Sequence, residues 1–273
     1  MKQIIIHSIA GVLLVSILFF SFHAYRSAKK YEEKTALLVA QMSAKSLVTY
    51  RAQELVEELS FGFYKNKKHE ILQEIEEKQH FYKTQSRSYT LYAISALLIL
   101  LLGYFVISLR MFTFFGAITA GVMLFFGFVS PMLMITIHKK VEYLGDVVLS
   151  FESKSIIGSI AKLFENGDIA VAIVILFFSI LIPIVKVLSI LFISLFTENR
   201  FAHSIIEFFK VIGKWSMIDV FVVATFLAYL TVDKGDVSRA EIEVGFYFFL
   251  VYVIVSMLVS LGANRMLHQV KDS

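Results

Sequence analysis

Long apolar stretches constrain the fold of this chain more than any other feature of its sequence. A helix needs about 20 apolar residues to cross the hydrocarbon core of a membrane, and roughly six stretches satisfy this rule. Hydrophobic residues make up 58% of the 273 residues, and only two of the residues are proline. The sequence therefore predicts an all-α, polytopic membrane protein with about six transmembrane helices.

The predicted spans are distributed along the whole chain. The second and third share one apolar run that is too long for a single span, and Arg110 near its middle predicts a turn at the membrane surface. The six predicted spans are 4–22, two within 88–137, 169–196, 213 to about 230, and about 244–261.

A charged segment, 25–88, separates the first two spans. It contains no proline, and its only glycine is Gly62. The spacing of its apolar residues predicts two long helices that fold back near this glycine. We therefore divide the chain into 1–110, two spans joined by an extramembrane helical hairpin, and 111–273, a four-helix membrane module. The hairpin is either a solvated linker or a docking or sensor element, and we expect it to fold independently of the module.

The stretch SKSIIGSIAKLFENGD, residues 153–168, is amphipathic and too short to span. Its isoleucines, leucine and phenylalanine fall on one helical face, whereas Lys154, Lys162 and Glu165 lie off that face. This pattern predicts a short helix lying in the membrane interface, followed by a turn that returns the chain to the bilayer.

Lys186 is the least expected residue in the predicted spans. It lies about 15 Å deep at 1.5 Å rise per residue, and a lysine there costs at least about 3 kcal/mol unless it is paired or reaches water. Snorkelling to the surface is one explanation. However, Ser179, Pro183 and Lys186 share one helical face, and Pro183 leaves the carbonyl of Ser179 without its usual donor. Such a face favours contact with protein or a wet cavity.

Asp219 has two interpretations. In the first, Ser216 and Asp219 form a capping box at a helix start, and Lys214 and Trp215 are interface anchors. In the second, Asp219 is the counter-charge of Lys186, because their spans run antiparallel and their backbone depths differ by only about 9 Å. The spacing allows both interpretations.

The remaining motifs exclude several classes of function. The chain has no cysteine, and no two histidines show metal-ligand spacing on one predicted membrane helix, so we expect no metal and no cofactor. Nucleotide-binding and hydrolase motifs are absent, so we expect no enzyme. A net charge of +4 does not argue for nucleic acid. Pro131 breaks the third predicted span, and we expect a kinked helix there.

From about residue 111 to 264 the chain resembles the paraquat-inducible protein A family of inner-membrane proteins. Four motifs in this order carry the resemblance: VSP, GSIAKLFENGDIAVAIVILFFSILIPIVKVL, GKWSMIDVFVV and IEVGFYFFLVY. The resemblance implies a subunit that passes phospholipid between the inner membrane and a periplasmic MCE-type tunnel protein. It also implies an intramembrane proton relay, carried over to Ser179, Lys186, Ser216 and Asp219.

The chain departs from the family pattern in several respects. It has one module and no cysteine for a zinc ribbon, and the hairpin is an addition. The single module leaves two alternatives: it assembles as a homo-oligomer, or the hairpin serves as the element that docks the partner. The family's polar position in the last helix has only Ser256 and Ser260 as candidates. The resemblance implies cytoplasmic termini and a periplasmic hairpin, whereas the basic residues flanking the hairpin favour the reverse. Two further hypotheses remain: a membrane sensor or scaffold, and a proton-coupled transporter of a small solute.

Overall fold

The computed structural model describes residues 2–41, 68–105, 107–141, 145–195 and 238–271. The described elements are, in chain order, α1 (Lys2–Gln41), α3 (Lys68–Leu102), the 3-10 turn η1 (Gly103–Phe105), α4 (Leu109–Val129), β1 (Leu133–Val141), β2 (Gly145–Lys154), α5 (Ile156–Glu165), α6 (Ile169–Ile175), the π-helical segment η2 (Leu176–Leu181), α7 (Ile182–Leu195), β3 (Ser238–Ile242) and α10 (Val244–Lys271).

The helices confirm the predicted class of protein. Five described stretches are long and apolar enough to cross a membrane: α1, α3, α4, α6 to α7, and α10. The protein is therefore an all-α, polytopic membrane protein to which a small sheet is added. The fifth predicted span, 213 to about 230, lies outside the described residues, and so do Gly62 and the predicted turn of the hairpin.

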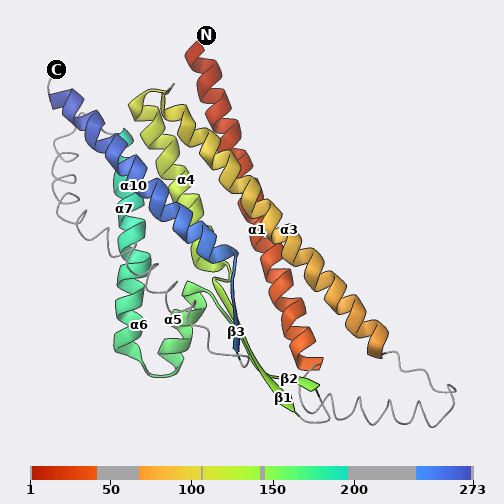
Figure 1. Ribbon diagram of the computed structural model, residues 1–273. Helices are drawn as coiled ribbons and strands as arrows, with labels where there is room; N and C mark the ends of the chain where they lie inside the picture. The colour runs from red at the N-terminus through yellow and green to blue at the C-terminus, as the bar shows by residue number, and fades with distance from the viewer. Residues whose placement is uncertain (1, 42–67, 106, 142–144, 196–237, 272–273) are drawn as a thin grey trace, which may run out of the picture.

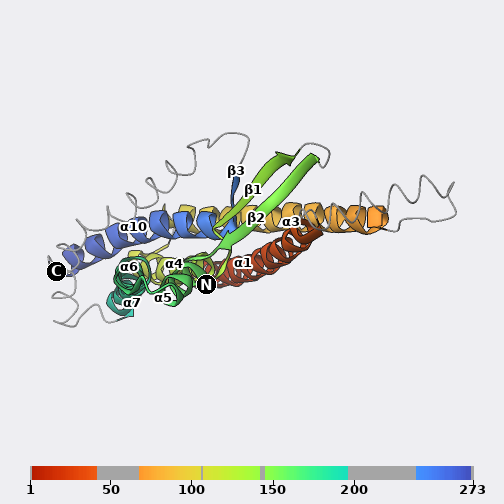
Figure 2. The same cartoon turned by 90° about the horizontal axis from the view of Figure 1, so that it is seen from below.

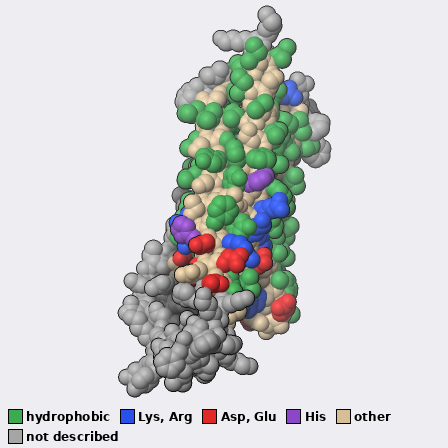
Figure 3. Space-filling model, turned by 90° about the vertical axis from the view of Figure 1, so that its right-hand side faces the viewer, with side chains coloured by type: hydrophobic (Ala, Val, Ile, Leu, Met, Phe, Trp, Pro, Cys, Tyr) green, Lys and Arg blue, Asp and Glu red, His purple; other side chains and the backbone are tan. Residues whose placement is uncertain are grey.

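The elements divide the molecule into two ends (Figure 1). The N-terminus of α1, the turn between α3 and α4, and the C-terminus of α10 lie at one end. The sheet, α5, the C-terminus of α1 and the N-terminus of α3 lie at the other end. On the face shown in Figure 3, charged side chains gather near this second end, and the rest of that face is largely hydrophobic. We call this second end the sheet end.

α1 and α3 run antiparallel and pack against each other (Figure 1 and Figure 2). Many of their buried positions follow steps of three and four residues, and most of these are small. They include Ile17, Ser21, Ala24, Ala28, Tyr31 and Thr35 on α1, and Ser86, Thr90, Ala93, Leu97 and Leu100 on α3. This spacing keeps one stripe of α1 facing α3 from Ile17 to Thr35.

α4 and α10 approach closely through glycines. A methyl group on Gly116 would come within 2.5 Å of the Val259 side chain, and one on Gly127 within 3.1 Å of the Phe249 backbone nitrogen. The aromatic rings of α10 then fill the space beside these glycines, and Phe248 and Tyr252 are fully buried. Among the described helices of the module, α4 therefore packs against α10 on one side and also contacts α7.

The chain between α4 and α5 corrects the predicted third span. We expected a kinked helix to residue 137, but α4 ends at Val129, and Ser130 adopts an extended backbone before Pro131. A 21-residue helix already spans about 31 Å, the thickness of the hydrocarbon core. Leu133–Val141 is instead the central strand of an antiparallel sheet with the order β2-β1-β3. The sheet was not predicted, although residues 135–137 and 147–151 are rich in β-branched residues.

α5 is the predicted short amphipathic helix. Ser155 caps it by accepting from the Gly158 N–H at 3.1 Å, and Gly167 turns the chain with a φ of 86°.

The hairpin helices contact the module, because Tyr31 and Lys83 both bind Glu241 of β3. Independent folding of the hairpin stays a prediction.

Gly245 offers a test of the packing between α10 and the α4–β1 corner. A Cβ atom there would lie 2.5 Å from the Ser130 carbonyl oxygen and 2.8 Å from that of Pro131. Because these are backbone atoms, we expect Gly245→Ala to reduce stability by about 1–3 kcal/mol, as overpacking usually does. Thermal unfolding of the detergent-purified protein measures the change.

Gly11 of α1 provides the matched control, since nothing lies within 4 Å of a Cβ atom there. Gly11→Ala should leave stability unchanged or raise it by about 0.5–1 kcal/mol through helix propensity. Equal unfolding temperatures for the two variants would contradict the close packing at Gly245.

Candidate functional site: a buried lysine and a charged junction

Lys186 belongs to α7, and its side chain lies inside the membrane module, against α10. Its side chain is only 8% exposed, and its Nζ donates to the Ser256 hydroxyl oxygen at 3.2 Å. The Ser256 hydroxyl in turn donates to the Val253 carbonyl oxygen at 3.0 Å. Because that hydroxyl proton is already engaged, the lone pairs of Ser256 are free to accept from the lysine. Ser256 therefore supplies one polar contact at this depth.

The local helix geometry before Lys186 follows from Pro183. A proline has no N–H for the carbonyl four residues earlier, and its ring clashes with that carbonyl. The π-helical segment Leu176–Leu181 directly precedes Pro183, and its wider turn accommodates this break. The regular helix resumes at Ile182, and both Pro183 and Lys186 are buried. The proline thus interrupts the span without ending it.

Ser179 and Lys186 lie on the same side of this span but not in contact. Ser179 borders a cavity that Phe249 of α10 also lines, whereas Lys186 contacts Ser256 of α10. Ser179 and Lys186 are seven residues apart on their span, and so are Phe249 and Ser256 on α10, which corresponds to about 10 Å along the helix axis. The shared face expected from the sequence is therefore present, but its polar groups lie two turns apart.

Four of the predicted site residues lie outside the described residues. These are Lys214, Trp215, Ser216 and Asp219. The pairing of Asp219 with Lys186 therefore stays a prediction. Of the two serines proposed for the last helix, the structure brings Ser256 to the lysine.

A second polar cluster, which the sequence analysis missed, joins the hairpin to the module. The Glu241 Oε2 atom accepts from Lys83 Nζ at 2.6 Å and from the Tyr31 hydroxyl at 3.0 Å. The three residues come from β3, α3 and α1. Together with Glu243 we call them the Glu241 junction. Only the sequence AEIEV, residues 240–244 at the start of the last span, hinted at it, and the partners of Glu241 lie 158 and 210 positions away.

The two carboxyl groups of the junction differ in their electrostatics. Burial alone would raise the pKa of Glu241, but the hydrogen bond and charge of Lys83 bring that pKa below its usual range. Glu243 is 5% exposed. Burial, followed by the charge of Glu241, raises the pKa of Glu243 to about 7, against the opposing charges of Lys83 and Arg87. Glu243 therefore titrates near neutral pH.

No group of three or more His, Cys, Asp or Glu residues suited to a metal ion occurs within the described ranges.

Comparison with known proteins shows which family the module resembles. A model of the family described as paraquat-inducible protein A matches residues 112–269. The "Probable intermembrane transport protein" of Haemophilus influenzae is 27% identical over 110 residues, which cover 38% of this chain and 26% of the relative. The "Intermembrane transport protein PqiA" of Escherichia coli K12 is 30% identical over 118 residues, or 41% and 28%.

The match spans little more than a quarter of either relative's length. No solved structure matches the chain. The matched region includes Lys186, Ser256 and Glu241, whereas Tyr31 and Lys83 precede it. The Glu241 junction thus connects the region that matches the family, 112–269, to the hairpin helices α1 and α3, which precede that region.

The pKa of Glu243 predicts how the stability depends on pH. Because the pKa rises from 4.5 unfolded to about 7 folded, the folded state binds more protons between these values, and stability falls as pH rises through this window. Glu243→Gln removes this loss, so it should stabilise the protein at pH 8 by up to about 3 kcal/mol and have little effect near pH 4.5.

Thermal unfolding of both proteins at pH 5 and pH 8 measures the difference. Glu241→Gln is the control, because the pKa of Glu241 is lowered and its ionised form is the stabilising one. This variant should destabilise at pH 8. A Glu243→Gln effect that is the same at both pH values would contradict the raised pKa.

Proposed function

Because the chain belongs to the paraquat-inducible protein A family, we propose that it is the inner-membrane subunit of a system that transports phospholipid between membranes. Two of its relatives are named intermembrane transport proteins, which supports transport as the class of activity. The observation that carries the proposal is Lys186, buried in the membrane module with Ser256 as a partner.

Lys186 is proposed to act as part of a polar relay. A lysine within the bilayer costs at least about 3 kcal/mol, and such residues commonly mark ion or substrate pathways. An amine that alternates between its charged and neutral forms can accept and release a proton. Asp219 is the proposed counter-charge, Ser256 holds the amine in place, and Ser179 and Ser216 extend the polar path.

The partner is proposed to be an MCE-type periplasmic protein that meets the sheet end. The sheet, α5 and the outward ends of α1 and α3 all lie at this end of the molecule, so one orientation exposes them together. We propose that the termini are cytoplasmic and the sheet end periplasmic.

The Glu241 junction favours a role for the hairpin in this system. It fixes β3 to both hairpin helices, and β3 continues directly into α10, which carries Ser256. A displacement of the hairpin by a docked partner would therefore reach the helix that contacts Lys186. This observation also suits the alternative function, a sensor whose input is the hairpin.

Replacing the buried amine tests the relay. We expect Lys186→Met to abolish lipid transport and complementation of a deletion strain, with protein levels in the membrane close to normal, because methionine keeps the packing and removes the charge. Val185→Met is the matched control, since Val185 is the neighbouring residue and is 45% exposed. Full transport by Lys186→Met would refute the relay.

Asp219→Asn separates the two interpretations of Asp219. If Asp219 is the counter-charge, the variant should be inactive, and the Lys186→Met/Asp219→Asn double variant should be no worse than either single one. If Asp219 is only a capping residue, asparagine costs about 1 kcal/mol or less and activity should persist. An active Asp219→Asn beside an inactive Lys186→Met would reject the pair.

Cysteine labelling tests the orientation in this cysteine-free chain. Lys162 of α5 has a side chain that is 57% exposed, so Lys162→Cys should react with a membrane-impermeant maleimide added to intact cells whose outer membrane is permeabilised. Ile173→Cys, on the apolar surface of α6, should stay unreactive. Labelling of Lys162→Cys from the cytoplasmic side alone would reverse the proposed topology.

A further inference from the structure

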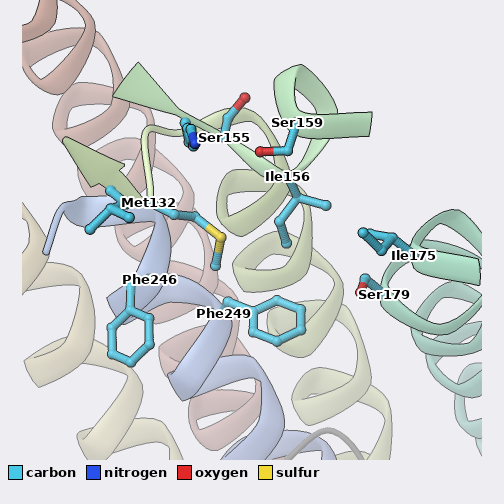
Figure 4. Close-up of a pocket in the computed structure, with 10 residues that line it drawn as sticks. Met132, Ser155, Ile156, Ser159, Ile175, Ser179, Phe246 and Phe249 are labelled. Atoms are coloured by element: carbon cyan, nitrogen blue, oxygen red, sulfur yellow. The ribbon is translucent and has the colours of Figure 1, made fainter. Parts of the chain in front are cut away.

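A mostly apolar cavity of about 290 Å³ lies below α5, beside α6 and α10 (Figure 4). Ile156 of α5 and Phe249 of α10 face Ile175 and Ser179 across it. Leu133, the first residue of β1, also lines it. This volume is at the lower end of the range for ligand pockets, about 300–1,000 Å³, so the cavity suits one hydrocarbon chain rather than two.

The polar groups of the cavity lie mainly at the end of β2 and the start of α5. Lys154, Ser155 and Ser159 belong to its lining, and Figure 4 shows both serines on the far side of Ile156 from Phe249. The site therefore has an apolar part toward α10 and a polar part at α5. This separation matches an amphiphile with one chain inserted.

The charges at the polar part favour an anion. Lys154 and Lys162 bind the two oxygens of the same carboxyl group, Glu152, at 3.1 and 3.0 Å. Their hydrogen bonds lower the pKa of Glu152, which therefore stays ionised at neutral pH. Two ammonium groups and one carboxylate leave the cluster with a net charge of +1 (2 − 1), which complements a phosphate.

The surroundings connect the cavity to lipid. α5 keeps Ile157 and Phe164 exposed, at 46% and 43%, as expected of a helix lying in the interface. Ile169, Val171 and Ile173 on α6 are also more than half exposed, so the apolar surface beside the cavity faces the bilayer. A lipid of the leaflet at the sheet end thus lies next to both its apolar and its polar part.

We propose that this cavity binds one acyl chain of an anionic phospholipid from the leaflet at the sheet end, with the phosphate beside Lys154. The second chain stays in the bilayer. The proposal rests on the proposed function in one respect: the bound phospholipid is the substrate in the state before or after transfer. Its occupancy is nevertheless measurable without transport.

Photo-cross-linking in nanodiscs tests the occupancy. The probe is phosphatidylglycerol with a diazirine near the end of one acyl chain, added to discs that hold the full-length protein. Phe249 and Leu133 are only 5% and 3% exposed, so lipids around the outside of the protein do not reach them. We expect peptide mass spectrometry to find cross-links at these two residues.

Ile175→Trp fills the cavity and should reduce these cross-links at least tenfold. Ile173→Trp, on the same helix but 53% exposed to lipid, is the matched control and should leave them unchanged. Cross-links confined to exposed residues such as Val171 would overturn the proposal. Cross-links at Phe249 that persist in Ile175→Trp would also overturn it. The same holds for cross-links within the protein that show another segment of the chain filling the cavity.

A separate experiment tests whether the site prefers an anionic headgroup. Lys154→Gln should reduce cross-linking by the phosphatidylglycerol probe more than by a phosphatidylcholine probe, because only the former carries a net charge. Lys78→Gln is the control, because Lys78 lies on α3 with a side chain that is 52% exposed, and it belongs neither to the cavity lining nor to the Glu152 cluster. Equal loss with both probes, or none, would overturn the anionic preference.

Failure of the two proposals is distinguishable. Cross-linking reports on the cavity even in the Lys186→Met protein, and a negative result there leaves the transport result for Lys186 unaffected. An Ile175→Trp variant that loses cross-linking but transports lipid normally would overturn the link between the cavity and transport alone.

Discussion

The close approach of α10 to α4 is the constraint on which the rest of the membrane module depends. Gly116 and Gly127 remove the side chains that would separate the two helices, and Gly245 allows α10 to begin directly against the carbonyls of Ser130 and Pro131. Without a hydrophobic driving force inside lipid, association of this kind comes from backbone proximity and packing contacts. The depth of Ser256, and hence the position of its contact with Lys186, follows from where α10 is held against α4.

The sequence was sufficient where the lipid environment dictates structure. Length and apolarity identified the described spans, and the amphipathic pattern of 153–168 identified α5 and the turn that follows it. Lys186 was found because a charged residue within an apolar run is energetically conspicuous.

The sequence was insufficient where distant segments combine. The residues of strand β1 are largely apolar where they follow the membrane span, so the sequence predicted that the helix continues to residue 137. In the structure the helix α4 ends at Val129, before Pro131. The Glu241 junction joins three elements whose partners lie 158 and 210 positions apart, and no local pattern encodes such a contact. The cavity likewise is lined by residues of six elements, namely β1, β2, α5, α6, η2 and α10, and none of these segments indicates a cavity by its own sequence.

The length of α1 has a consequence for distance. α1 has 40 residues, no proline and a single glycine, Gly11, so at 1.5 Å per residue it measures about 60 Å, roughly twice the hydrocarbon thickness. Its buried seam against α3 runs from Ile17, within the first predicted span, to Thr35, within the charged segment, so the helix pair continues beyond that span. Removing one heptad from each helix would shorten it by about 10 Å while keeping the small residues in register. The height above the bilayer at which α1 ends is thus encoded in a count of residues.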